Sequence, residues 1–190
     1  MSDKYDCANT VTFRSTPKTL GNIMTHLTGE QGVFDFNKLI PIPTELLDIK
    51  LFAIGDKDYY YSSKKYMGTT LLGPPTVEWL EDNCLDPFTL RRLKTTHGFL
   101  SRNDWCVKNW GIVDNSANAS YTYNEAVVEP TTRTELTYTF DTVWSEPQPI
   151  YNALCEYVSK HDSNDNIEFQ WYFDDSVQDY KGYMSLQLDQ

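Results

Sequence analysis

Residues 105–111, which read WCVKNWG, bring a thiol and an amine close to two indole rings. A nucleophilic cysteine needs a cationic, partly open environment that lowers the pKa of its thiol. On a helix, Cys106 and Trp110 share a face because they are four residues apart, whereas Lys108 points elsewhere. No acid or base follows Cys106 by three or four positions. We therefore interpret the motif as a packing anchor.

Metal ligands are not grouped in the sequence. The stretch HDSNDN at 161–166 begins like a calcium loop, but the sixth and twelfth loop positions are Ile167 and Phe173. A calcium loop requires glycine and glutamate there, so a polar turn is the better interpretation. We expect no metal and no cofactor. The three histidines are scattered along the chain, at His26, His97 and His161.

Motifs for other catalytic chemistry are also missing. The sequence contains no G-x-S-x-G nucleophile motif and no G-x-x-x-x-G-K-[ST] phosphate loop. Asp174 and Asp175 are adjacent, and on a strand they would point to opposite faces, which is poor geometry for a catalytic pair. We expect a protein that is not an enzyme, with buried free thiols. The four cysteines form no CxxC pair: Cys7, Cys84, Cys106 and Cys155.

The charge of the chain is unevenly distributed. The net charge is −11, and residues 141–190 alone contain ten acidic and two basic residues. Residues 91–110 contain five basic residues and one acidic residue. An acidic field repels nucleic acid and favours a partner protein with a basic surface, unless the acidity serves only solubility. The candidate partner-binding acids are Asp162, Asp165, Glu168, Asp174, Asp175 and Asp179.

The basic segment supports a second hypothesis, that of a nucleic-acid-binding module. Its positive charges fall on predicted helices between residues 91 and 108, where they could contact phosphates. We consider nucleic acid the less favoured partner, since a solvated helix face explains the same pattern. The residues of this alternative are Arg91, Arg92, Lys94, Arg102 and Lys108.

Length and hydropathy indicate a globular protein. The 190 residues, of which 40% are hydrophobic, suffice for a single domain with a real core. No run approaches the roughly 18 apolar residues that a membrane helix needs, and the N-terminus lacks an apolar signal-peptide run. We expect a cytoplasmic protein with no membrane contact.

Periodicity predicts the elements that position these residues. Apolar and polar residues alternate at 8–15, 133–142, 167–173 and 182–188, which is typical of half-buried strands. Asp86, Pro87 and Gly98 bound the best-marked helix. Other helices are predicted at 15–27, 101–110 and 145–161, a further strand at 121–128, and a short extended segment at 34–48.

The order of these elements predicts an α+β fold. It approximates a split β-α-β arrangement, a ferredoxin-like antiparallel sheet with helices on one face. The core would comprise residues 8–48 and 112–190, and residues 49–111 would form a mainly helical insertion. If the rings of 167–173 face the helices, the open face would be a poor RNA platform, whereas reversed sheet faces would remove this argument. It would present Thr10, Thr12, Thr137, Thr139, Glu168, Gln170, Gln187, Tyr172 and Tyr183.

The chain resembles the YubB ferredoxin-like domain family of phage and plasmid proteins. Four stretches carry this resemblance: ANTVTFRST at 8–16, FDFNKLIPIPTEL at 34–46, WCVKNWG at 105–111 and FDTVWSEPQPIYNAL at 140–154. The resemblance implies a ferredoxin-like sheet with a helical insertion, on a protein of a mobile element. It implies no iron–sulfur chemistry and no catalytic residues.

Together these observations suggest a non-enzymatic interaction protein of a phage or mobile element. It would bind, and thereby inhibit, a host protein that acts in defence or in nucleic-acid handling. Its acidic surface would meet a basic patch of that partner, with mimicry of DNA as one way to do so.

Overall fold

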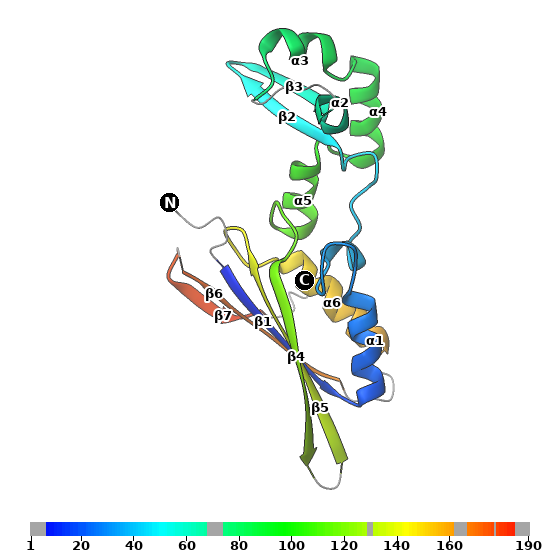
Figure 1. The fold of residues 1–190 in the computed structure, drawn as a ribbon, viewed down its shortest axis with the longest axis vertical. Coiled ribbons are helices and arrows are strands. Elements are labelled where there is room, and N and C mark those ends of the chain that lie inside the picture. The colour runs from blue at the N-terminus through cyan, green and yellow to red at the C-terminus, as the bar shows by residue number, and fades with distance from the viewer. Residues whose placement is uncertain (1–6, 68–73, 129–130, 162–166, 177, 185–190) are drawn as a thin grey trace, which may run out of the picture. The chain divides into compact units, whose positions relative to one another are not determined.

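The computed structural model describes residues 7–67, 74–128, 131–161, 167–176 and 178–184 (Figure 1). The chain divides into two compact units, which we describe separately. Residues 1–41 and 109–190 form the first, here called the sheet unit, and residues 42–108 form the second, here called the inserted unit.

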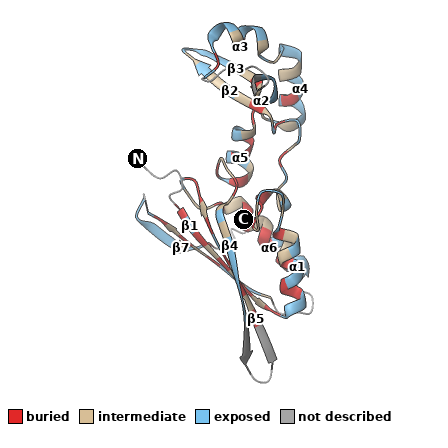
Figure 2. Ribbon diagram, in the orientation of Figure 1, coloured by how far each residue is buried: buried red, intermediate tan, exposed pale blue. Residues whose placement is uncertain are grey.

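The sheet unit contains a five-stranded antiparallel sheet, so the protein is α+β. The strand order is β4-β5-β1-β6-β7, with β1 in the centre and the most exposed strands, β4 and β7, at the two edges (Figure 2). Every neighbouring pair is antiparallel. The strands are β1 (Cys7–Ser15), β4 (Ala117–Val128), β5 (Thr131–Thr142), β6 (Glu168–Asp175) and β7 (Tyr180–Tyr183).

Alternation along the strands separates a core face from an open face. Val11 lies opposite Tyr138 on one neighbouring strand and opposite Trp171 on the other, and all three are buried. Trp171 and Phe173 are buried, so of the two orientations that the alternation allows, the one with these rings on the core side is observed. Side chains alternate along a strand, so the residues that neighbour these buried positions point to the opposite side of the sheet, the open face, which the two helices do not cover.

Two helices cover the core face: α1 (Pro17–Leu27) and α6 (Gln148–His161). Thr16 caps α1 by accepting a hydrogen bond from the backbone of Thr19. Tyr151 of α6 lies with its ring 5.8 Å from that of Trp171 on the sheet. No helix in the described part of the chain is long and apolar enough to cross a membrane.

The predicted extended segment at 34–48 is wrong. Residues Phe36–Lys38 form a 3-10 helix, η1, because the Asp35 carboxylate accepts a hydrogen bond from the backbone of Asn37 and closes a turn. Phe34 and Phe36 alternate as they would on a strand, and both are buried. They contribute to the core without joining the sheet.

The WCVKNWG motif is a packing anchor, as predicted. Cys106 and Trp110 are fully buried on helix α5 (Arg102–Trp110). The Trp110 indole donates a hydrogen bond of 2.8 Å to the carbonyl oxygen of Ile40. Gly111 follows the helix with φ of 85°, a conformation that favours glycine.

The inserted unit combines a two-stranded sheet with short helices. Its core gathers Tyr59, Tyr61 and Leu80, with Trp79 packed against them. Helix α4 begins after the Asp86 cap and ends at Gly98, as predicted. The elements of this unit are β2 (Ile49–Ile54), β3 (Lys57–Ser62), α2 (Ser63–Met67), α3 (Val77–Asn83), α4 (Pro87–His97) and most of α5.

Candidate functional site

The open face of the sheet carries the polar residues that the alternation predicts. Its centre is uncharged, and its threonines hydrogen-bond across strands. The hydroxyl oxygens of Thr12 and Thr137 are 3.2 Å apart, and those of Ser120 and Thr139 are 2.9 Å apart. These contacts order the hydroxyl rows without neutralising any charge. Gln187, also predicted here, lies outside the described residues.

Charged residues flank this centre in two rows across the strands. One row holds Glu135, Arg14 and Glu168, and the Arg14 Nε atom is 2.8 Å from a carboxylate oxygen of Glu135. The other row holds Asp141 and Asp174, which lie on either side of Ala8 of the central strand. Lys181 lies opposite Asp174 on β7.

The predicted acidic set is only partly on this surface. Glu168 and Asp174 lie on the open face, and Asp179 is exposed in the turn between β6 and β7. Asp175 is buried, so its assignment to an exposed acidic surface is wrong. It points to the core side of the strand, where its carboxylate accepts a hydrogen bond from the backbone of Gln178. Asp162 and Asp165 lie outside the described residues.

The net negative charge belongs entirely to the sheet unit. Residues 42–108 contain nine acidic and nine basic residues, so the inserted unit is neutral. The sheet unit contains the other 18 acidic and seven basic residues, and thus the whole net charge of −11. A strongly charged unit is therefore joined to a neutral one.

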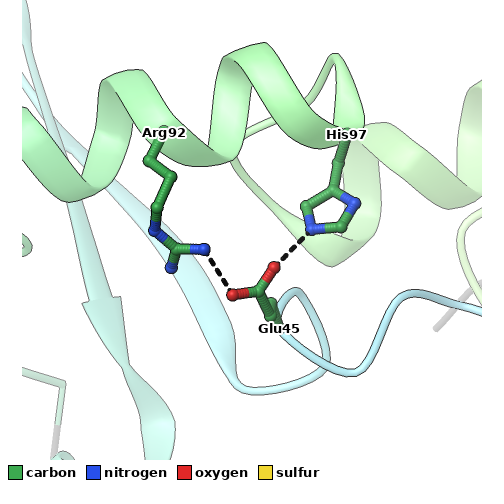
Figure 3. Close-up of polar contacts among 3 residues, drawn as sticks. All are labelled: Glu45, Arg92 and His97. Carbon is green, nitrogen blue, oxygen red and sulfur yellow. Dashed lines mark hydrogen bonds and ion pairs between the residues drawn. The ribbon is translucent and has the colours of Figure 1, made fainter.

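The predicted basic residues all belong to the inserted unit. Arg92 is already paired, because its guanidinium contacts Glu45, whose other carboxylate oxygen lies 2.7 Å from Nε2 of His97 (Figure 3). Local periodicity does not predict this cluster, because Glu45 precedes Arg92 by 47 positions and His97 by 52 positions. A groove of about 290 Å³ lies beside it, lined by Thr44, Glu45, Asp48, Ile49, Ser62, Leu85, Thr89, Arg92 and Leu93.

Two hydrogen bonds lower the pKa of Glu45 below its ordinary value of 4.5, the larger effect coming from His97 and the smaller from Arg92. A lowered folded-state pKa stabilises the fold above the unfolded-state pKa, and this stabilisation is lost as the pH falls through the folded-state value. We expect wild type to be more stable than Glu45→Gln at pH 7 and the difference to shrink below about pH 4.5. Urea unfolding of both proteins across this range is the measurement. A difference that does not change with pH would contradict this role for Glu45.

Of the other basic residues, Arg91 lies beside an exposed aromatic ring, that of Phe88. Phe88 is 76% exposed on α4, and Arg91 and Arg92 follow it by three and four positions on the same helical face. Lys94 lies elsewhere, with its ammonium 5.9 Å from the centre of the Phe99 ring. The remaining predicted bases, Arg102 and Lys108, belong to α5.

Two of the three scattered histidines converge in the sheet unit. The ring of Tyr157 stacks on His26 at 3.9 Å and lies 4.3 Å from the ring of His161. Burial, followed by the charges of Lys38 and His161, lowers the pKa of His26. Within the described ranges, no three histidine, cysteine or acidic side chains are placed to hold a metal ion.

The buried thiols are poorly suited to nucleophilic chemistry. Burial, with a smaller contribution from the nearby Asp175 charge, raises the pKa of the Cys7 thiol to about 11. Burial also raises the pKa of Cys155. A nucleophilic cysteine requires a shift in the opposite direction. Cys84 is exposed on the inserted unit.

Comparison of the chain with protein-family models, curated proteins and solved structures found no match in any of the three.

Proposed function

We propose that the chain is a non-enzymatic interaction protein that binds a basic partner protein through the open face of its sheet unit. The observation that carries this proposal is the charge distribution, because the entire net charge of −11 lies on that unit. A unit with a large net negative charge attracts positively charged partners and steers their approach.

The described residues of the open face fit such a contact. Its two ends together carry four acidic and two basic residues. The uncharged centre between them offers hydroxyl and amide groups. A partner would thus meet charge at the ends and hydrogen-bonding groups between them, which is typical of interfaces that use electrostatics for specificity. The acids are Glu135, Asp141, Glu168 and Asp174, and the bases are Arg14 and Lys181.

Membership of the YubB ferredoxin-like family is part of the same proposal. The order β6-β1-β5-β4, with α1 after β1 and α6 between β5 and β6, supports a split β-α-β sheet to which β7 adds a fifth strand. On this basis the partner is a protein of the bacterial host of a phage or plasmid, and binding inhibits its work in defence or nucleic-acid handling. A partner that binds DNA or RNA would present the required basic surface.

Neutralising the acids of the open face tests this proposal. The triple variant Asp141→Asn, Glu168→Gln and Asp174→Asn should bind its partner about tenfold more weakly, since each exposed pair contributes about 0.2–1 kcal/mol. The tagged protein is used to capture partners from a bacterial lysate at about 50 mM and about 500 mM salt, and capture should fall at the higher salt. The affinity for the captured protein is then measured with each variant.

A second triple variant provides the matched control. Glu30→Gln, Glu78→Gln and Glu156→Gln remove the same number of exposed acids from other surfaces and should leave the affinity nearly unchanged. Equal losses in the two variants, or binding that is insensitive to salt, would reject the open face as the interface. Failure to capture any protein would count against the proposal as a whole.

The second candidate function is binding of single-stranded nucleic acid by the inserted unit. The exposed Phe88 beside Arg91 favours it, because such sites combine aromatic stacking with basic side chains. Filter binding of single-stranded DNA at about 50 mM salt tests it, with Phe88→Ala and Arg91→Ala expected to weaken binding. No binding by the wild-type protein would remove this candidate.

A further inference from the structure

The two edges of the sheet are protected against strand pairing to very different degrees. β7 forms one edge of the sheet and has only four residues, one of which is Lys181. β4 ends the other with twelve residues, and nothing in the described part of the chain pairs with its outer side. Proteins usually protect an edge with charge, proline, a bulge or a short strand.

β4 lacks most of these protections. Residues 117–124 contain no charged residue and no proline, although they belong to a unit of net charge −11. The irregularity in its pairing is confined to the start of the strand, between Ala117 and Ser120. Tyr121 is 44% exposed, and Ser120 to Asn124 are exposed throughout (Figure 2).

We propose that β4 is a dimerisation edge, which pairs in antiparallel fashion with β4 of a second copy of this chain. The two sheets would then join into one continuous sheet of ten strands around a two-fold axis. A two-fold axis perpendicular to the sheet keeps each side chain on its own face, so hydroxyl side chains meet hydroxyl side chains and tyrosines meet tyrosines.

The sequence of β4 is compatible with itself in this arrangement. If the axis passes at Tyr121, that residue faces its own copy, and Ser120 faces Thr122 of the second chain. If it passes at Thr122, Tyr121 faces Tyr123 of the second chain. In either register residues 120–124 face only uncharged residues of the second chain, so like charges do not oppose each other there.

Neutrality of the edge favours a second copy over the basic partner proposed above. A basic strand would find no opposite charge along residues 117–124, whereas an identical neutral strand would bury no unpaired charge there. Each copy has a net charge of −11, so repulsion between the units should weaken the dimer at low salt. Added salt should therefore strengthen the dimer, the opposite of its effect on binding at the open face.

Sedimentation equilibrium at several protein concentrations and salt concentrations tests the proposal. The expected result is a reversible species of twice 22.0 kDa whose dissociation constant falls as salt is added. A monomer at all concentrations up to about 100 μM, where an association of about −5 kcal/mol would already be visible, would overturn it. That result would leave binding at the open face unaffected, so the two proposals fail separately.

Variants at the two edges locate the contact. Tyr121→Glu places two like charges directly opposite each other in the register centred on Tyr121, and on diagonally neighbouring positions in the register centred on Thr122. In either register it should raise the dissociation constant about tenfold or more. Tyr183→Glu makes the same change at the 71% exposed tyrosine of β7 and should leave it unchanged. Equal effects would exclude β4 as the contact.

Cross-linking tests the same contact without the Tyr121→Glu variant, in case that variant fails to fold. In a Cys84→Ser background, Tyr121→Cys or Thr122→Cys should form an intermolecular disulfide on mild oxidation, because opposed residues of antiparallel strands lie within disulfide range. Tyr183→Cys should not. Absence of the disulfide at both β4 positions would overturn the proposal.

Discussion

Replacing Trp171 by alanine is expected to lower the free energy of unfolding of the sheet unit by about 3–5 kcal/mol. The side chain is 1% exposed and lies at the centre of the core, with its ring 5.9 Å from that of Phe34 and 5.6 Å from that of Phe140. Its removal leaves a cavity among rings that pack edge to face. Urea unfolding followed by circular dichroism measures the loss, since the fluorescence of the protein changes with the substitution itself.

The indole nitrogen of Trp171 adds a polar component to this loss. Nε1 donates a hydrogen bond of 3.0 Å to Oδ1 of Asn9, whose own amide donates to Thr142 inside the core. Trp171→Phe keeps most of the ring but leaves the Asn9 oxygen without its indole donor, so we expect a loss of about 1–3 kcal/mol. Trp144→Ala, at a 60% exposed tryptophan, should change stability by less than about 0.5 kcal/mol. Equal effects of Trp171→Ala and Trp144→Ala would contradict this account of the core.

Local signals in the sequence were sufficient for many of the elements. Alternation in β1 identified Val11 and Phe13 as buried, and the Asp86 cap with Gly98 placed the ends of α4 correctly. These features depend on neighbours within a few residues, which the sequence displays directly. The extended segment predicted at 34–48 was wrong because the side chain of Asp35 accepts a hydrogen bond from the backbone of Asn37, which closes a turn instead.

Non-local pairings could not be predicted in the same way. Arg92 appeared to be part of a free basic segment, yet it contacts Glu45, 47 positions earlier in the chain. Asp175 was predicted to lie on an exposed acidic surface, yet it is buried, and the backbone of the following turn supplies its hydrogen bond. The confinement of the net charge to one unit likewise depends on a boundary that the structure defines. Such features require the register of distant segments, which local periodicity does not contain.

Introducing a methyl group at Gly29 is expected to destabilise the sheet unit by about 3 kcal/mol. A Cβ atom there would overlap Oδ2 of Asp35, so one of the two residues must move. Asp35 is buried, and its carboxylate accepts hydrogen bonds from the backbone of Asn37 and, at 2.6 Å, from the side chain of Asn115. Displacing this carboxylate would leave buried donors unpaired. Urea unfolding of Gly29→Ala against wild type is the measurement.

A double-mutant cycle separates this clash from a general intolerance of alanine at Gly29. If contact with Asp35 causes the loss, Gly29→Ala should cost far less in an Asp35→Ala background, because the obstructing carboxylate is then absent. Additive losses would show that the contact is not the cause. Gly21→Ala is the matched control: Gly21 lies within α1 with no atom within 4 Å of the added carbon. Alanine is the better helix former, so this variant should gain about 0.5–1 kcal/mol.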